Sequence, residues 1–227
     1  MKASKSRPDQ DRIPARLFPR RLIAFGYGLQ AKAAPAFRKT RIHPNLVSLA
    51  GLGAGIAAGA LFSLGRPVAA GLALVLCGLL DVLDGTIAVE TRRQTLFGAS
   101  LDSTLDRYSE FFVYAGLAHL FRESPAMWLA WAAFLGSVMV SYTRARAEGL
   151  GVDVRTGIMQ RAERLAVLAL AAFIGPAFRV RDQALIAALG LIALLANFTA
   201  GQRVWAVRAA DRKRRPSSIS DSKRVKP

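Results

Sequence analysis

Four aspartates interrupt two apolar stretches of the chain, and they are the residues best suited to chemistry. Asp81 and Asp84 are three positions apart near the end of one stretch, and Asp102 and Asp106 are four positions apart near the start of the next. Either spacing places a pair on one face of a helix, and an antiparallel return of the chain would let the two pairs face each other. Because carboxylates are costly inside a membrane helix, these four are functional candidates.

Oxygen ligands that converge at one point suit hard divalent cations, so the sequence predicts a site for Mg²⁺ or Mn²⁺. Four carboxylates can hold two ions about 3.5–4 Å apart, which would neutralise a pyrophosphate and polarise the phosphorus under attack. The alternative is a set of solvated carboxylates that cap helix ends. It accounts for Asp102 near a helix N-terminus, but Asp81 and Asp84 lie near a C-terminus, where the helix dipole disfavours them.

Charged and apolar residues lie in separate segments of the chain, and the apolar segments are the elements that must position these aspartates. Hydrophobic residues make up 52% of 227 residues, yet the formal net charge is +17, with Lys and Arg concentrated near both termini and in a few short interior stretches. Between them lie apolar segments near the length of about 20 residues that crosses a bilayer. We therefore predict an all-α integral membrane protein with six transmembrane helices in a bundle. Their expected spans are 45–64, 68–88, 101–121, 127–142, 165–178 and 184–206.

The charged segments divide the chain into three predicted parts. Residues 1–43 form a basic tail with an interfacial helix at about 18–37 that lies on an anionic leaflet, or alternatively a plain basic linker. Residues 44–207 form the membrane domain, and residues 208–227 form a basic, disordered tail. No apolar stretch of about 7–15 residues follows the basic N-terminus promptly, which argues against a secretory signal peptide.

The basic loops also predict an orientation. Every second loop, together with both termini, carries the richer set of arginines, so the positive-inside rule places both termini and the aspartate site in the cytoplasm of a multi-pass cell-membrane protein. The basic ends at residues 1–17 and 208–227 contain no aromatic residue, so contact with anionic lipid explains them better than contact with nucleic acid. The single cysteine, Cys77, lies in an apolar run and is interpreted as a buried structural thiol.

The aspartates form part of a longer motif. From Asp81 to Asp106 the chain follows the pattern D-x2-D-G-x2-A-R-x8-G-x3-D-x3-D at every fixed position except Val89, where the pattern has Arg. This closely resembles the signature of the CDP-alcohol phosphotransferase family, whose fold has six helices. The resemblance implies a phospholipid-synthesis enzyme that transfers a substituted phosphate group from a CDP-activated lipid such as CDP-diacylglycerol to a small alcohol acceptor. It also implies release of CMP, a two-metal site and a homodimer.

By the same resemblance, Asp81, Asp84 and Asp102 are metal ligands, while Asp106 contacts the metals and is the base that takes the acceptor hydroxyl proton. Three small residues would leave room for the cytidine and phosphates, and two polar residues at the start of the first helix would line the nucleotide site. They are Gly85, Ala88, Gly98, Asn45 and Ser48.

The departure at Val89 removes an arginine that normally supports the donor phosphates. Arg92 and Arg93 lie three and four positions further on and share that face of the helix if the helix continues. Two interpretations stay open. Either arginine substitutes for the missing one, or both are ordinary positive-inside anchors.

Two basic segments indicate which acceptor the enzyme would use. Residues 141–149 read S-Y-T-R-A-R-A-E-G and residues 160–164 read Q-R-A-E-R, which is similar to the family branch that makes phosphatidylinositol phosphate. Because several guanidinium groups suit a dianionic phosphate, we expect inositol phosphate ahead of glycerol 3-phosphate or another alcohol. The residues expected to bind it are Arg144, Arg161, Arg164 and Arg203. Alternatively, these charges set the topology and pair with Glu148 and Glu163.

Outside the enzyme class, an ion-coupled transporter also places carboxylates inside a membrane. Such a protein would show inverted repeats with broken helices in both halves. Residues 127–206 contain no second copy of the aspartate pattern, so the sequence favours the enzyme.

Overall fold

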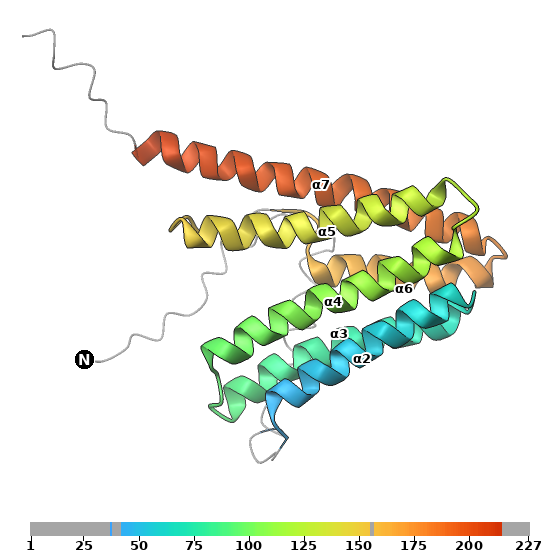
Figure 1. Ribbon diagram of the computed structural model, residues 1–227, viewed down its shortest axis with the longest axis horizontal. Helices are drawn as coiled ribbons and strands as arrows, with labels where there is room; N and C mark the ends of the chain where they lie inside the picture. Colours follow the sequence, from blue (N-terminus) through green and yellow to red (C-terminus); the bar gives the residue numbers. More distant parts are fainter. Residues whose placement is uncertain (1–36, 38–41, 155–156, 215–227) are drawn as a thin grey trace, which may run out of the picture.

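The computed structural model describes residues 37, 42–154 and 157–214. Within these residues the backbone forms six α-helices and no strand, which confirms the all-α prediction. The helices lie roughly along one direction in an elongated bundle (Figure 1). They are α2 (Pro44–Ser63), α3 (Pro67–Glu90), α4 (Leu96–Leu120), α5 (Ala126–Gly149), α6 (Arg161–Ala177) and α7 (Arg181–Arg214). The expected interfacial helix at about 18–37 lies outside the described residues, apart from Phe37.

Local signals set the ends of the helices that carry the aspartates. Gly65 adopts a φ of +68° after α2, and Pro67 begins α3, where a missing backbone N–H costs no hydrogen bond. Thr95 caps α4, since its side-chain oxygen accepts a hydrogen bond from the Gly98 amide at 2.9 Å. The C-terminal part of α3 and the N-terminal part of α4 therefore meet at one end of the bundle, on the left in Figure 1.

The six helices close into a ring. Following the packed neighbours, the order around the ring is α2, α3, α6, α7, α5, α4 and back to α2. Glycines allow a close crossing between α2 and α4, because a Cβ on Gly59 would overlap the carbonyl of Phe112 and a Cβ on Gly116 would overlap Gly59. The buried interior is apolar over most of its length, with Phe62, Leu117 and Leu189 completely buried.

The outward faces of the bundle are also apolar. Leu72, Leu79, Leu135 and Leu194 are each more than half exposed. Four helices of the described chain are long and apolar enough to cross a membrane, namely α2, α3, α5 and residues Arg181–Arg212 of α7. The protein is therefore a membrane protein whose exposed leucines face lipid.

Several helices run further than the sequence predicts. α5 continues to Gly149 rather than ending at 142, so the basic segment at 141–149 lies on a helix and not in a loop. α7 continues to Arg214, so residues 208–214 are helical and the expected disordered tail does not begin at 208. Alanine and arginine are good helix formers, and the charge of these segments had suggested the shorter spans.

Candidate metal and nucleotide site

Three of the four predicted ligands converge between α3 and α4. Asp81, Asp102 and Asp106 each offer a carboxylate oxygen, and these three oxygens lie within 4.8 Å of one another. All three side chains are partly buried. Oxygen ligands in a partly buried cluster are the set that hard divalent cations prefer, so the residues fit the divalent ion that the motif implies.

The fourth aspartate is anchored from a different helix. Asp84 lies about one turn from Asp81 along α3 and is only 5% exposed. Its Oδ2 accepts a hydrogen bond of 2.6 Å from the Ser48 hydroxyl on α2. Ser48, predicted as a nucleotide-site residue, therefore orients a carboxylate of the motif, which is a role that the sequence did not indicate.

The small residues of the motif lie at the same end of the bundle. A Cβ at Gly85 would meet no atom within 4 Å, so helix packing does not require glycine there. At Gly98 a Cβ would lie 3.3 Å from Oδ1 of Asn45 and 3.0 Å from Oγ1 of Thr95, which brings Asn45 on α2 beside the start of α4. Ala88 is half-buried on α3. The exposed backbone at Gly85 is what close approach of a ligand needs.

The helical face that Val89, Arg92 and Arg93 would share if the helix continued does not form. α3 ends at Glu90, and the exposed Arg92 adopts a φ of +55°, a left-handed conformation that stops the helix. The Arg93 amide then bonds back to the Ala88 carbonyl at 2.9 Å. Residues 91–95 carry only polar side chains, which provide no apolar face to pack against another helix. The chain therefore turns here instead of extending α3.

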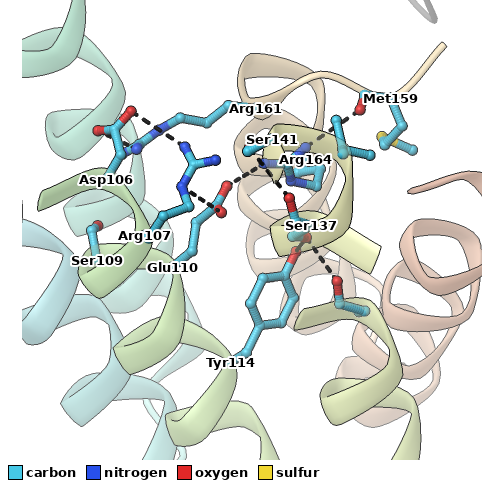
Figure 2. A network of polar contacts seen from close by, with 12 residues as sticks. Asp106, Arg107, Ser109, Glu110, Tyr114, Ser137, Ser141, Met159, Arg161 and Arg164 are labelled. Atoms are coloured by element: carbon cyan, nitrogen blue, oxygen red, sulfur yellow. Dashed lines mark hydrogen bonds and ion pairs between the residues drawn. The ribbon is translucent and has the colours of Figure 1, made fainter. Parts of the chain in front are cut away.

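Arg161 is the acceptor candidate that the structure brings to the aspartates. It begins α6, its side chain is 13% exposed, and Nη1 forms an ion pair with Oδ1 of Asp106 (Figure 2). Its Nε lies 4.0 Å from Oδ2 of Asp81. A guanidinium group thus lies directly beside the predicted base.

The other three acceptor candidates lie elsewhere. Arg144 is exposed on α5, and its Nε lies 2.9 Å from Oε1 of Glu148, the pairing that the topology alternative anticipated. Arg203 is buried on α7, and its Nη1 donates to the Val140 carbonyl. Arg164 is 1% exposed and pairs with Glu110 inside the bundle.

Sequence reasoning missed two charged residues of the site, Arg107 and Glu110. Arg107 lies 3.5 Å from Asp106 and 3.6 Å from Glu110, so it bridges the two acids on α4. Glu110 follows Asp106 by four positions, a spacing that placed it on the motif's face of the helix. That spacing was the available signal, and it extends the polar site a full turn deeper into the bundle.

Comparison with known proteins decides the family. The family model for CDP-alcohol phosphatidyltransferase matches residues 41–207, which include all four aspartates. The chain belongs to this family. The resemblance that rested on residues 81–106 is thereby confirmed, and the chain is a phosphatidyl transferase rather than an ion-coupled transporter.

Similar members of the CDP-alcohol phosphatidyltransferase family include two synthases of inositol lipids. Archaetidylinositol phosphate synthase of Methanothermobacter thermautotrophicus is 33% identical over 174 residues, covering 75% of this chain and 87% of the relative. Phosphatidylinositol phosphate synthase of Mycolicibacterium smegmatis is 35% identical over 189 residues, covering 80% of this chain and 85% of the relative.

Solved structures of one family member are also similar to this chain. Phosphatidylinositol phosphate synthase of Mycobacterium tuberculosis with CDP-DAG bound is 29% identical, has a TM-score of 0.70 and covers 84% of this chain and 96% of its own. The same enzyme in complex with manganese and citrate is 28% identical, with a TM-score of 0.71 over 84% of this chain and 91% of its own. A manganese complex in a relative and the acidic cluster of this chain together indicate use of a divalent metal.

Proposed function

We propose that this phosphatidyl transferase moves a phosphatidyl group from CDP-diacylglycerol to inositol phosphate and releases CMP. The observation that carries the acceptor assignment is the position of Arg161, whose guanidinium group pairs with Asp106 and lies 4.0 Å from Asp81. A phosphorylated acceptor held by Arg161 would bring its hydroxyl to the aspartates. The named relatives support the same acceptor, because several are synthases of inositol lipid phosphates.

In the proposed reaction Asp106 is the base. The acceptor hydroxyl oxygen forms a bond to the phosphorus that carries the diacylglyceryl group, its proton moves to an Oδ of Asp106, and the bond from that phosphorus to the CMP oxygen breaks. Asp81, Asp84, Asp102 and Asp106 would hold two divalent ions, Mg²⁺ or Mn²⁺. Bound there, the ions supply positive charge that stabilises the pyrophosphate and the leaving CMP.

The proposed donor site lies where α2, α3 and α4 meet. Ser48 holds Asp84 in place, and Asn45 and Gly98 lie together at the start of their helices. The open backbone at Gly85, with Ala88 one turn further on, would receive the cytidine and phosphates. Arg92 or Arg93 in the exposed turn after α3 would neutralise the donor phosphates that Val89 cannot contact.

The proposed acceptor site draws on arginines of three helices. Arg161 on α6 lies beside the aspartates, whereas Arg144 on α5 lies against Glu148 and Arg203 on α7 donates to the Val140 carbonyl. A dianionic phosphate held by Arg161 would also accept hydrogen bonds from Arg144 and Arg203 if these two side chains left Glu148 and the Val140 carbonyl. Arg164 offers less, because it is buried and its terminal nitrogens already bond to Glu110 and the Met159 carbonyl.

An acceptor panel tests the proposal. The purified enzyme is incubated with CDP-diacylglycerol, Mg²⁺ and inositol phosphate, glycerol 3-phosphate, free inositol or serine in turn, and CMP is measured. We expect release to be fastest with inositol phosphate. Faster release with glycerol 3-phosphate would favour the second candidate, the same transfer to that acceptor. Faster release with inositol or serine than with either phosphorylated polyol would contradict a phosphate-binding acceptor site.

We further propose that all six helices cross the membrane, including the short α6 and the charged α4, with both termini and the aspartates on the cytoplasmic side. An even number of spans with basic ends supports this orientation. Accessibility of N- and C-terminal tags from the two sides of inverted vesicles measures it, and tags on opposite sides would contradict it. The enzyme is proposed to form a homodimer, which in-membrane crosslinking would detect.

A further inference from the structure

Two ion pairs connect α4 and α6 like successive rungs of a ladder (Figure 2). The outer rung joins Asp106 to Arg161 at the aspartate site, and the inner rung joins Glu110 to Arg164 one turn deeper on both helices. Arg107 lies 3.5 Å from Asp106 and 3.6 Å from Glu110, so it links the two rungs along α4.

The inner rung lies in the interior of the ring. α4 and α6 are not among the neighbouring pairs that form the ring, so the ladder spans the space that the ring encloses. Glu110 is 3% exposed and Arg164 is 1% exposed. Nη1 of Arg164 also donates to the Met159 carbonyl at 3.3 Å, which ties α6 to the segment that precedes it.

We propose that Glu110 and Arg164 are positioning residues that fix the rotation and depth of α6 relative to α4, and thereby hold Arg161 against Asp106. This inference rests on the proposed roles of Asp106 as base and Arg161 as acceptor ligand. Helices move as rigid units over one turn, so a fixed inner rung sets the place of the outer rung. Neither Glu110 nor Arg164 touches substrate in this assignment.

Stability alone is a weak reason for such a pair. Removing two charges from water costs about as much as their attraction returns, and apolar replacements of similar volume are often neutral or stabilising. Apolar side chains, however, let two helices pack at many relative rotations, whereas a hydrogen-bonded ion pair forms at only a few of these rotations. A buried pair directly beneath a catalytic site is therefore suited to fixing one helix register.

The decisive variant replaces both members by apolar residues of similar volume, Glu110→Leu with Arg164→Met. Arg164→Lys is the conservative companion, because it keeps the charge and shortens the reach to Glu110. Asn197→Leu is the matched control, since it removes an interhelical hydrogen bond of 3.2 Å from α7 to the Ala132 carbonyl on α5, outside the ladder. For each protein one measures the melting temperature in detergent, kcat, acceptor KM and Mn²⁺ affinity by electron paramagnetic resonance.

We expect the double variant to melt at or above the wild-type temperature, yet to lose about ten-fold or more in kcat and several-fold in Mn²⁺ affinity, as for other groups that orient metal ligands. Acceptor KM should rise together with the fall in kcat, because a shifted α6 also moves Arg161, the proposed acceptor ligand, away from Asp106. Arg164→Lys should fold and show an intermediate kcat, while Asn197→Leu should keep both kcat and Mn²⁺ affinity.

Wild-type kcat and Mn²⁺ affinity in either the double variant or Arg164→Lys would overturn the positioning role. A raised acceptor KM with unchanged kcat would instead make Arg164 an acceptor ligand. If the wild-type enzyme releases no CMP with any acceptor, the proposed function fails, and the Mn²⁺ comparison still decides whether the pair holds Asp106.

Discussion

The hydroxyl of Ser48 donates a 2.6 Å hydrogen bond to Oδ2 of Asp84, which lies 36 positions later in the chain. The contact joins the start of α2 to the aspartate motif on α3. Asp84 is 5% exposed, and a buried carboxylate needs such a donor because unpaired burial of a charge is costly. The contact therefore lets α2 orient a carboxylate of the predicted metal site.

Ser48→Ala tests this contact. Loss of the donor leaves Asp84 free to rotate, and groups that orient metal ligands typically change metal affinity or activity by about 10–100-fold. We expect weaker Mn²⁺ binding and lower kcat in that range, measured by electron paramagnetic resonance and CMP release. Ser63→Ala is the control, since that exposed hydroxyl bonds to the Ala60 carbonyl of its own helix. Equal behaviour of the two variants would contradict the role of Ser48.

Asparagine substitutions test the four aspartates one at a time. Asn keeps the size of the side chain but removes its charge, so each of Asp81→Asn, Asp84→Asn, Asp102→Asn and Asp106→Asn should lower kcat by about 10²-fold or more. Asp182→Asn at the other end of the bundle should keep activity within about two-fold. Near-normal CMP release from any two of the four variants would end the two-metal interpretation.

A pair of glycine variants separates packing from ligand binding. Gly59→Ala places a Cβ on the Phe112 carbonyl, so it should cost about 1–3 kcal/mol of stability and lower the melting temperature. Gly85→Ala meets no atom within 4 Å, so the melting temperature should stay unchanged while the donor KM rises. Gly85→Ala with an unchanged donor KM would show that the open backbone at Gly85 does not receive the donor.

Alanine substitutions decide between the two interpretations of Arg92 and Arg93. If one of them contacts the donor phosphates, its loss should raise the donor KM by about ten-fold, the value of one charge-assisted hydrogen bond. Val89→Arg should then recover part of that loss in the affected variant. If neither Arg92→Ala nor Arg93→Ala changes the donor KM, the two residues are membrane anchors.

Features that depend on short stretches of sequence were predictable. The apolar segments and the spacing of the aspartates are local, and the helices that they predicted are present in the described residues. Helix ends were less predictable where a helix continues beyond its apolar part into charged residues. α7 runs on through residues 208–214 for this reason, whereas α3 stops at Glu90, close to its predicted end at 88.

By itself, the sequence determined that this chain is a helical membrane protein, and spacing within a helix predicted that Asp81 and Asp84 share one face and Asp102 and Asp106 another. That Asp81, Asp102 and Asp106 converge depends on how α3 and α4 pack. Only the tertiary structure decided that Ser48 binds Asp84, that Arg161 rather than Arg164 lies beside Asp106, and that Glu110 is buried with Arg164. These contacts depend on the rotation and depth at which separate helices pack. That choice is made by close crossings such as Gly59 against Phe112, between residues far apart in the chain.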